Sequence, residues 1–327
     1  MGLPARRALV IQTAFLGDVV LATALAERLL DGGYEVDFLL RAGNESLLRD
    51  HPRLRRVLVW EKRRGKYRDW WRLLREIRAA EYAVVVNPHR YAATGLWTAL
   101  SGAPMRLGFR QNPLSSAYTY RRDHVMGDGT HEVERNDRLL SPLLTAGVVP
   151  SEGLPRPRLY PSRAEDAVAQ ATPRPYVTIA PASVWYTKRY PPDRWAALIA
   201  RLPPGTHVHL LGGPADRPLC EEIAAASERS CEVRAGDLSL LGSAALMRHA
   251  TMNYANDSSP VHLASAVDAP VRAFFLSTTP ALGFGPLSSD AAVRETSETL
   301  TCRPCGKTGR RACPLGHFAC ARIEPEP

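Results

Sequence analysis

Short apolar runs alternate with longer amphipathic stretches along the whole chain. The runs are ALVIQ, EVDFLL, RVLVW and YAVVVN in the first half, and YVTIA, HVHLLGG, TMNYAND and VRAFF in the second half. Runs of this length, bounded by turn residues, predict buried strands, and the stretches between them predict helices. Strands that alternate with helices build parallel sheets covered by helices. The pattern therefore predicts an α/β protein with two parallel sheets.

A proline-rich stretch, VVPSEGLPRPRLYPS (residues 148–162), separates the two series and is typical of a linker between domains. We therefore expect an N-terminal domain over residues 1–160 and a C-terminal domain over residues 161–327, each large enough to bury a core. Two Rossmann-like domains whose parallel sheets face each other across a cleft form the GT-B architecture of glycosyltransferases. The periodicity alone also permits other two-domain α/β proteins.

The chain is basic and lacks the signals of membrane insertion. Lys and Arg number 42 against 33 Asp and Glu, and the formal charge of +9 indicates an anionic partner. No stretch approaches the length of a membrane span, and the start MGLPARRALVIQ lacks the apolar region of a signal peptide, so we expect a cytoplasmic protein. A basic cluster in the first half is either a solvated surface or a functional patch. Its members are Arg53, Arg55, Arg56, Lys62, Arg63, Arg64, Lys66, Arg68, Arg72, Arg75 and Arg78.

The stretch TAFLGDVVLATAL (residues 13–25) follows the first apolar run and joins a glycine turn to a helical pattern. This is the pattern of a first βα unit in a nucleotide-binding fold, in which ligands bind at the carboxyl ends of the strands. Asp18 belongs to that turn. It is either a charge that is favourable at a helix N-terminus or a working carboxylate that faces a cleft.

The loop PASVWYTKRYPP follows the run YVTIA and leads into a helix that we expect to begin near Pro192. A loop of small residues at a helix start presents free backbone N–H groups and the positive end of the helix dipole to an anion. Thr187 adds a hydroxyl and Lys188 a charge, so the loop would hold a diphosphate and stabilise it as a leaving group. An ordinary βα loop with an exposed lysine is the alternative.

The stretch YANDSSPVHLASAV places Asn256, Asp257, Ser258 and Ser259 between a predicted strand and a predicted helix. One of these polar residues is expected to cap the helix. Because a cap needs only one side chain, the excess predicts that Asp257 or its neighbours also bind a sugar or ribose hydroxyl.

Two familiar nucleotide motifs are incomplete in this sequence. CGKTGR (residues 305–310) ends like a phosphate-binding P-loop, but Thr301 stands where that motif needs glycine, and no strand is predicted before it. No G-x-G-x-x-G pattern follows the first strand of either half, which argues against a dehydrogenase.

The tail is rich in cysteine. Cys302, Cys305, Cys313 and Cys320, with His317 nearby, offer enough ligands for zinc or a metal cluster. The second pair lacks the tight spacing of a zinc ribbon, and a cytoplasmic setting disfavours stable disulfides. We therefore favour reduced thiols or a conditional disulfide, and expect no metal and no cofactor.

Several segments, in order over nearly the whole chain, resemble the ADP-heptose:lipopolysaccharide heptosyltransferase family (glycosyltransferase family 9), which has the GT-B fold. They are FLGDVVLATALAERL, RLGFR, HEVERNDRLL, SVWYTKRYPPDRWAAL, HLLGGPAD and NDSSPVHLASAVDAPVRAFF. The tail CRPCGKTGRRACPLGHFAC is similar to that of the heptosyltransferase II branch, which adds the second heptose of the inner core.

The resemblance implies an inverting transfer of L-glycero-D-manno-heptose from ADP-heptose to a Kdo-lipid A that already carries one heptose. Asp18 matches the general base proposed for the family, which would deprotonate the acceptor hydroxyl while ADP leaves. Lys188, together with Thr187, matches the position that neutralises the diphosphate of the donor.

The resemblance also identifies a donor segment and three departures from the family pattern. Asp257 matches an aspartate at the phosphates and sugar of the donor, and we expect Ser258 and Ser259 to bind the donor with it. The family usually has glycine at the positions of Ser259 and Leu276, and an aromatic residue such as Trp at Tyr190. We expect Leu276 to narrow the donor pocket. We also expect that Ser259 or Leu276, each in place of a glycine, alters the choice of donor or the activity.

The implied acceptor is anionic and lies in the cytoplasmic leaflet of the inner membrane. We expect Lys62, Arg63 and Arg64 to attract its phosphates and carboxylates, and the protein to contact the membrane surface peripherally. No nucleic-acid partner is expected, because no nucleic-acid-binding motif is present. Two alternatives stay open: a transferase of the same fold with another nucleotide sugar or glycan acceptor, and a non-catalytic relative that binds nucleotide sugars.

Overall fold

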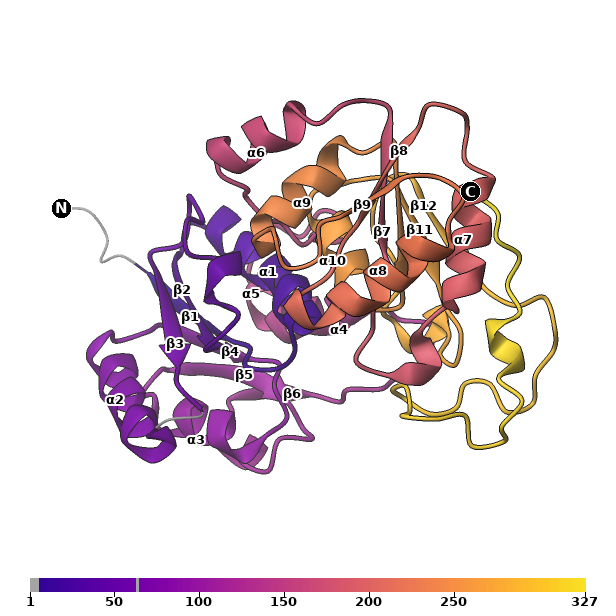
Figure 1. Ribbon diagram of the computed structural model, residues 1–327. Coiled ribbons are helices and arrows are strands. Elements are labelled where there is room, and N and C mark those ends of the chain that lie inside the picture. The colour runs from indigo at the N-terminus through magenta and orange to yellow at the C-terminus, as the bar shows by residue number, and fades with distance from the viewer. Residues whose placement is uncertain (1–5, 63–64) are drawn as a thin grey trace. The chain divides into compact units, whose positions relative to one another are not determined.

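The computed structural model describes residues 6–62 and 65–327, which divide into two compact units (Figure 1). Unit 1 comprises Met1–Val125 and Glu132–Tyr160, and unit 2 comprises Met126–His131 and Pro161–Pro327. Each unit contains a six-stranded parallel sheet, as the alternating pattern predicts. None of the helices within the described ranges is long and apolar enough to cross a bilayer.

The sheet of unit 1 has the strand order β3-β2-β1-β4-β5-β6. The strands are β1 (Arg7–Ile11), β2 (Glu35–Arg41), β3 (Arg56–Trp60), β4 (Val84–Asn87), β5 (Met105–Phe109) and β6 (Tyr120–Arg122). The chain adds strands on one side of β1 and then on the other, so the topological switch point lies between β1 and β4. Ligands of doubly wound sheets bind at the carboxyl ends of the strands beside this point.

Helices connect some of the strands of unit 1 and also follow its last strand. They are α1 (Leu16–Asp31), α2 (Lys66–Ala79), α3 (Ala92–Leu100), α4 (Glu132–Asp137) and α5 (Ser141–Thr145), with short 3-10 helices at Glu45–Leu47, Ser115–Ala117 and Arg138–Leu140. Most side chains of α1 are buried, because apolar residues occur on every side of this helix. In contrast, α2 buries only Leu73, Leu74 and Ile77 and is mostly charged on its other faces.

The proline-rich stretch at residues 148–162 is held against unit 1 over much of its length. Arg28 of α1 pairs with Asp137 and donates hydrogen bonds to the carbonyl oxygens of Pro150 and Gly153 at 2.7 and 2.6 Å. A buried arginine with several acceptors fixes such a segment in place. Most of this stretch is therefore part of unit 1 and not a free linker.

The sheet of unit 2 has the order β12-β11-β10-β7-β8-β9, so its switch point lies between β7 and β10. The strands are β7 (Tyr176–Ala180), β8 (His207–Leu210), β9 (Cys231–Val233), β10 (Met252–Asn256), β11 (Val271–Phe274) and β12 (Ala291–Arg294). The helices are α6 (Arg163–Gln170), α7 (Pro192–Ala200), α8 (Arg217–Ala226), α9 (Leu240–His249) and α10 (Ser259–Ala266), with 3-10 helices at Tyr186–Lys188, Pro214–Asp216, Pro280–Leu282 and Ala319–Ala321. Its core includes Ile179, Trp195 and Phe274, which are fully buried.

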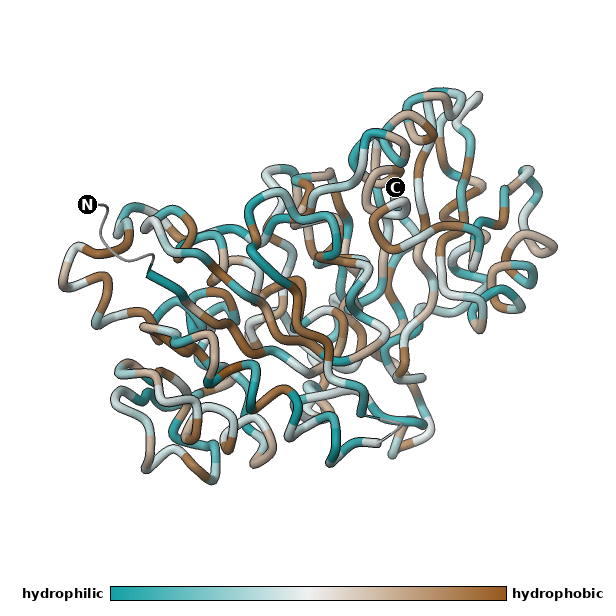
Figure 2. The backbone as a smooth tube through the Cα atoms, turned by 90° about the vertical axis from the view of Figure 1, so that its left-hand side faces the viewer, coloured by the Kyte–Doolittle hydropathy of each residue, from teal (hydrophilic) through white to brown (hydrophobic). Residues whose placement is uncertain are grey.

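Every strand predicted from an apolar run is present, with small shifts at the ends. Figure 2 shows the hydrophobic residues concentrated along the strands. Four strands are not predicted from the sequence: β5, which lies inside its sheet, and the short strands β6, β9 and β12, which lie at sheet edges. Edge strands bury less apolar surface than central ones, so their sequences carry a weaker pattern.

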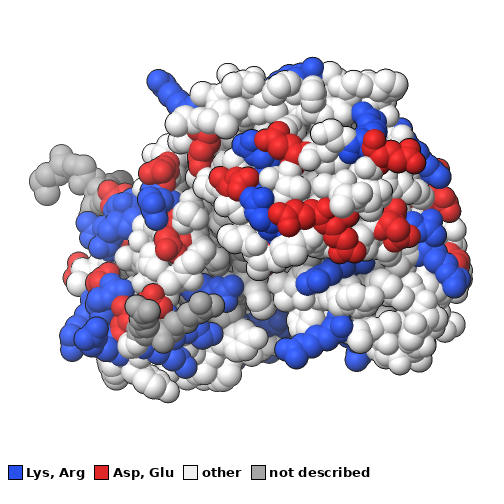
Figure 3. Space-filling view, viewed as in Figure 1, with Lys and Arg blue, Asp and Glu red and all other residues white. Residues whose placement is uncertain are grey.

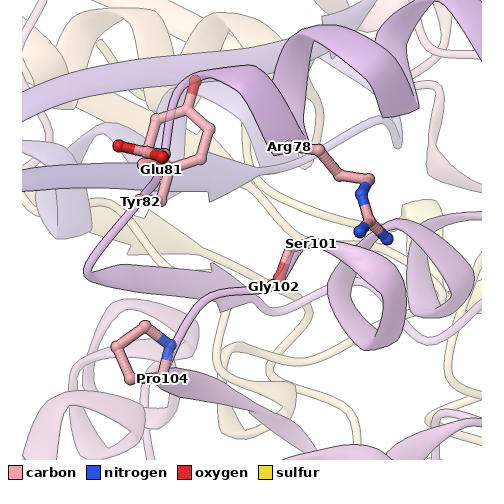
Figure 4. Close-up of a pocket in the computed structure, with 6 residues that line it drawn as sticks. All are labelled: Arg78, Glu81, Tyr82, Ser101, Gly102 and Pro104. Atoms are coloured by element: carbon pink, nitrogen blue, oxygen red, sulfur yellow. The ribbon is translucent and has the colours of Figure 1, made fainter.

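A pocket of about 360 Å³ lies at the amino ends of β4 and β5 (Figure 4). It is lined by Arg78, Glu81, Tyr82, Ser101, Gly102 and Pro104. Because all strands of the sheet are parallel, this pocket lies at the opposite edge from the turn that carries Asp18. It is therefore separate from the candidate site of unit 1.

Candidate functional site

Asp18 lies in the first turn of α1, directly after the carboxyl end of β1 and beside the switch point of unit 1. Burial is the main cause that raises the pKa of Asp18 to about 6, and the negative charge of Glu132 acts in the same direction. The backbone amide of Phe15 and the charges of Arg90 and His124 act against it. This carboxyl group is thus ionised at neutral pH but binds a proton more readily than an ordinary aspartate.

Glu132, the first residue of α4, supplies the like charge beside Asp18 from within a buried network. Its carboxylate lies 2.9 Å from Nε2 of His124 and 2.9 Å from Nε of Arg135. Burial alone would raise the pKa of Glu132, but these hydrogen bonds and charges outweigh it and lower the pKa. Glu132 therefore stays ionised and keeps the proton affinity of Asp18 high. The sequence analysis quoted this segment without assigning these residues a role.

Positive charges gather at the carboxyl edge of the same sheet. Burial, followed by the charges of Lys62, Arg90 and Arg41, lowers the pKa of His89 to about 4. His89 follows β4, and its Nδ1 lies 3.1 Å from the hydroxyl of Thr13. Arg41 ends β2, Lys62 follows β3 and Arg90 follows β4. These three cations therefore lie around the carboxyl end of β1. The predicted residue Lys62 is among them, whereas Arg63 and Arg64 lie outside the described residues.

Part of the basic cluster serves the fold of unit 1. Several of its arginines form ion pairs with carboxylates of the same unit. These pairs are Arg53 with Glu27 and Asp31, Arg55 and Arg56 with Asp37, and Arg72 with Asp69 and Glu76. Asp37 is completely buried, so its two arginines compensate a charge that would otherwise be costly. For these members the structure favours a structural role over an anion-binding patch.

The polar site of unit 2 lies at the carboxyl ends of β7 and β10, beside the switch point. Nζ of Lys188 lies 2.6 Å from Oδ2 of Asp257, and the hydroxyl of Thr278 donates a hydrogen bond to the same oxygen at 2.5 Å. Both members of the ion pair are mostly buried. The structure thus brings together Lys188 and Asp257, which are predicted separately from the sequence, and adds Thr278, which is not predicted.

Thr187 is buried, with 1% of its surface exposed, and its hydroxyl is fully engaged. The hydroxyl accepts hydrogen bonds from the backbone amide of Arg310 at 2.8 Å and from the hydroxyl of Ser277 at 3.0 Å. It donates to the carbonyl oxygen of Arg310 at 3.3 Å. A hydroxyl has one donor and two acceptor positions, so its capacity is used within the protein.

Several backbone N–H groups of this loop donate hydrogen bonds within the protein and are therefore not free for an anion. The amides of Thr187 and Lys188 donate to the carbonyl oxygens of Arg310 and Trp185. The amide of Tyr190 donates to Oδ1 of Asn256 at 3.0 Å, and α7 begins at a proline, which has no N–H. Lys188 adds a charged side chain to this loop, and that side chain is a candidate group for binding an anion.

Two further expectations are wrong. Ser258 occupies the N-cap position of α10, but its hydroxyl donates to the carbonyl oxygens of Ala182 and Asn256 and makes no capping bond. Leu276 is completely buried in the core of unit 2, so its side chain fills the core and does not narrow a donor pocket. Ser259 begins α10 and is partly exposed.

All six cysteines are free thiols. Sγ of Cys302 lies 3.8 Å from Nε2 of His317, and Cys320 packs in the core of unit 2. Across residues 6–62 and 65–327, no three His, Cys, Asp or Glu side chains are grouped closely enough to hold a metal ion.

Two doubly wound parallel sheets in one chain are the architecture of GT-B glycosyltransferases, and the solved structures of such enzymes share this fold. ADP-heptose lipopolysaccharide heptosyltransferase II of Escherichia coli superimposes with a TM-score of 0.79 at 22% identity, over 98% of this chain and 95% of that one. A family 9 glycosyltransferase of Veillonella parvula gives a TM-score of 0.76 at 21% identity, over 90% and 86% of the two chains.

Sequence comparison identifies the family. Residues 70–315 match the sequence model of glycosyltransferase family 9 (heptosyltransferase), and the chain belongs to this family. Lipopolysaccharide heptosyltransferase 1 of Pseudomonas aeruginosa is 28% identical over 324 residues, which cover 92% of this chain and 86% of that protein. Lipopolysaccharide heptosyltransferase 3 of E. coli is 27% identical over 80% of each chain. The protein is thus a glycosyltransferase of the heptosyltransferase family.

Proposed function

We propose that the enzyme transfers L-glycero-D-manno-heptose from ADP-heptose to heptosyl-Kdo-lipid A with inversion, as a member of the heptosyltransferase II branch. The observation that carries the proposal is the carboxyl group of Asp18, a base with a pKa of about 6 at the switch point of unit 1. Heptosyltransferase WaaC of E. coli, a solved relative of this fold, is described with ADP-2-deoxy-2-fluoro heptose, which supports an ADP-heptose donor.

In this reaction Asp18 is the general base. The acceptor hydroxyl loses its proton to the Asp18 carboxylate as its oxygen bonds to the anomeric carbon, while the bond from that carbon to the diphosphate oxygen breaks. A base works best when its pKa lies near the working pH, because it is then both ionised and basic. Burial and the charge of Glu132 bring the pKa of Asp18 into this range.

Lys188 is the proposed partner of the leaving diphosphate. Its ammonium group is fixed by Asp257 at 2.6 Å and is therefore oriented before the donor binds. A fixed positive charge stabilises negative charge that develops on a leaving group. Ser258 and Ser259, which adjoin Asp257 at the start of α10, are proposed as further donor contacts. Thr187 is proposed to support Lys188 in this site.

The proposed acceptor is anionic, and unit 1 offers cations for it. Lys62, Arg41 and Arg90 create the positive field at the carboxyl edge of the sheet that lowers the pKa of His89. Phosphates and carboxylates of a Kdo-lipid A would be attracted there. Arg63 and Arg64 remain proposed acceptor contacts.

The proposal places the enzyme at the cytoplasmic face of the inner membrane, and α2 offers a surface for peripheral contact. Tyr67 and Trp71 are 76% and 56% exposed and, being four residues apart, lie on one side of this helix. Lys66, Arg68 and Arg75 are exposed on the same helix. Figure 3 shows Lys and Arg side chains gathered over the part of unit 1 in which α2 lies. Exposed aromatic and basic residues favour an anionic membrane surface.

The reaction can be tested by mass spectrometry with ADP-heptose and mono-heptosylated Kdo-lipid A as substrates. We expect the acceptor mass to rise by one heptose, and ADP-glucose to compete poorly. Transfer to Kdo-lipid A without heptose, or from ADP-glucose, would identify the alternative transferase. ADP-heptose binding without transfer to either acceptor would favour a non-catalytic relative or a transferase with another glycan acceptor.

Membrane contact can be tested by sedimentation with vesicles of phosphatidylethanolamine and phosphatidylglycerol. We expect the double variant Tyr67→Ala/Trp71→Ala to bind roughly tenfold more weakly than the wild type. Val168→Ala, at an exposed apolar position of α6, is the control and should bind normally. Equal binding by all three proteins would show that α2 is not the contact surface.

A further inference from the structure

The cysteine-rich tail contacts the polar site of unit 2, although the proposed reaction gives it no role. We define the tail loop as residues 302–313. It lies more than a hundred residues after the loop of Lys188 in the sequence, yet it forms hydrogen bonds and close packing with that loop. Three sets of contacts show how the tail loop and the site depend on each other.

The first contact is a pair of hydrogen bonds between the main chain of Arg310 and Thr187. The amide of Thr187 donates to the carbonyl oxygen of Arg310 at 3.1 Å, and the amide of Arg310 donates to the Thr187 hydroxyl at 2.8 Å. Ser277 donates to the same hydroxyl at 3.0 Å. Thr187 therefore joins the tail loop to the segment that carries Thr278. Its buried hydroxyl acts as a structural link.

The second contact is the close approach of Gly309 to the side chain of Lys188. A Cβ atom at Gly309 would lie 2.4 Å from Cβ of Trp185 and 3.0 Å from Cγ of Lys188. The first distance is far below an ordinary contact, so only glycine allows the main chain to pass here. The main chain of the tail loop therefore packs directly against the aliphatic part of the Lys188 side chain.

The third contact is made by Arg303. Its guanidinium donates hydrogen bonds to the carbonyl oxygens of Leu276 and Thr278 at 2.6 and 2.8 Å. It also pairs with Glu295 at 2.6 Å. Thr278 binds Asp257, which in turn holds Lys188. The tail loop thus supports both sides of the ion pair.

We propose that the tail loop is a positioning element of the donor site, with Gly309, Arg303 and the main chain of Arg310 holding Lys188 and Thr278 in place. The proposal rests on the proposed role of Lys188 in binding the diphosphate. Supporting residues of this kind hold a functional side chain within a narrow range of positions. Less conformational entropy is then lost when the ligand binds.

The test compares Gly309→Ala with Gly285→Ala, a control glycine of unit 2 whose added Cβ would meet its nearest neighbour at an ordinary 3.8 Å. We expect Gly309→Ala to raise the Kd for ADP, measured by titration calorimetry, and the KM for ADP-heptose by roughly tenfold. The acceptor KM should not change. Gly285→Ala should match the wild type. Equal ADP affinity in a folded Gly309→Ala variant would overturn the proposal.

A second pair of variants keeps the test decisive if Gly309→Ala does not fold. Arg303→Met should raise the ADP Kd, and Arg303→Lys should recover part of the loss. Arg322→Met, which breaks only an exposed ion pair with Glu298, is the control. Normal ADP affinity in Arg303→Met would also overturn the proposal. Failure of the wild type to bind ADP would instead show that the proposed donor is wrong.

Discussion

The two units place an aspartate after a central strand, but they surround it in opposite ways. Asp18, after β1, is partly buried beside the like charge of Glu132, and burial followed by this charge raises its pKa to about 6. Asp257, after β10, is held by the ammonium group of Lys188 and the hydroxyl of Thr278. The first environment makes a carboxylate a better base, and the second fixes a cation for an anionic ligand. We propose that the same position in a doubly wound sheet supports proton transfer in one unit and charge stabilisation in the other.

The largest effect that we expect is the loss of catalytic rate when the carboxylate of Asp18 is removed. We predict that Asp18→Asn lowers kcat by about 10³-fold to 10⁴-fold, because the amide cannot accept the proton of the acceptor hydroxyl. Mass-spectrometric transfer assays would measure the loss. Asp31→Asn removes an exposed carboxylate from the other end of the same helix and should leave the rate within about twofold. A rate near that of the wild type in Asp18→Asn would show that another group is the base.

The next prediction concerns stability in unit 2. Asp257→Asn should lower the free energy of unfolding by about 3 kcal/mol, because it leaves the mostly buried charge of Lys188 without its partner. Urea unfolding monitored by circular dichroism would measure the change. The control Asp290→Asn breaks an exposed pair with Arg272 and should cost less than about 1 kcal/mol. Equal losses in the two variants would show that the Lys188 pair contributes little.

Removing the carboxylate of Asp18 should change the free energy of unfolding in the opposite direction to Asp257→Asn. The pKa of Asp18 is about 6 in the folded protein against an ordinary 3.8, so the folded state binds more protons between these values. Stability therefore falls as the pH rises from about 4 to about 6. We predict that Asp18→Asn stabilises the protein by up to about 3 kcal/mol at pH 7.5 and by about 0.5 kcal/mol at pH 4. Unfolding curves at both pH values measure the difference, and an equal effect at both would contradict the raised pKa.

The sequence predicts the parts of each candidate site that lie in the loop or the first helical turn after a strand. Asp18, Lys188 and Asp257 are identifiable because a polar residue between an apolar run and a helix stands out, and parallel strands bring such turns to one edge. The central strands are predictable for the same reason, since their apolar runs are long and continuous. This local information determines where a site lies and which charges it contains.

The partners of these residues come from distant parts of the chain and leave no local pattern. Glu132 reaches Asp18 from α4, and Arg310 reaches Thr187 across 123 residues. Arg55 is counted in a basic cluster, although its charge is compensated by Asp37 on the neighbouring strand. Only the folded structure shows which charges pair with one another, and these pairings decide the pKa of a carboxylate and whether a cation can bind a ligand.

The smallest predicted effect separates the two causes of the raised pKa of Asp18. Burial would persist in Glu132→Gln, but the negative charge would be lost, so the pKa of Asp18 should fall. The acidic limb of the pH profile of kcat/KM should then move to lower pH by the same amount. Glu134→Gln, in the same helix and exposed, is the matched control and should leave the profile in place. An unmoved limb in Glu132→Gln would mean that the charge of Glu132 does not contribute and that burial alone raises the pKa of Asp18.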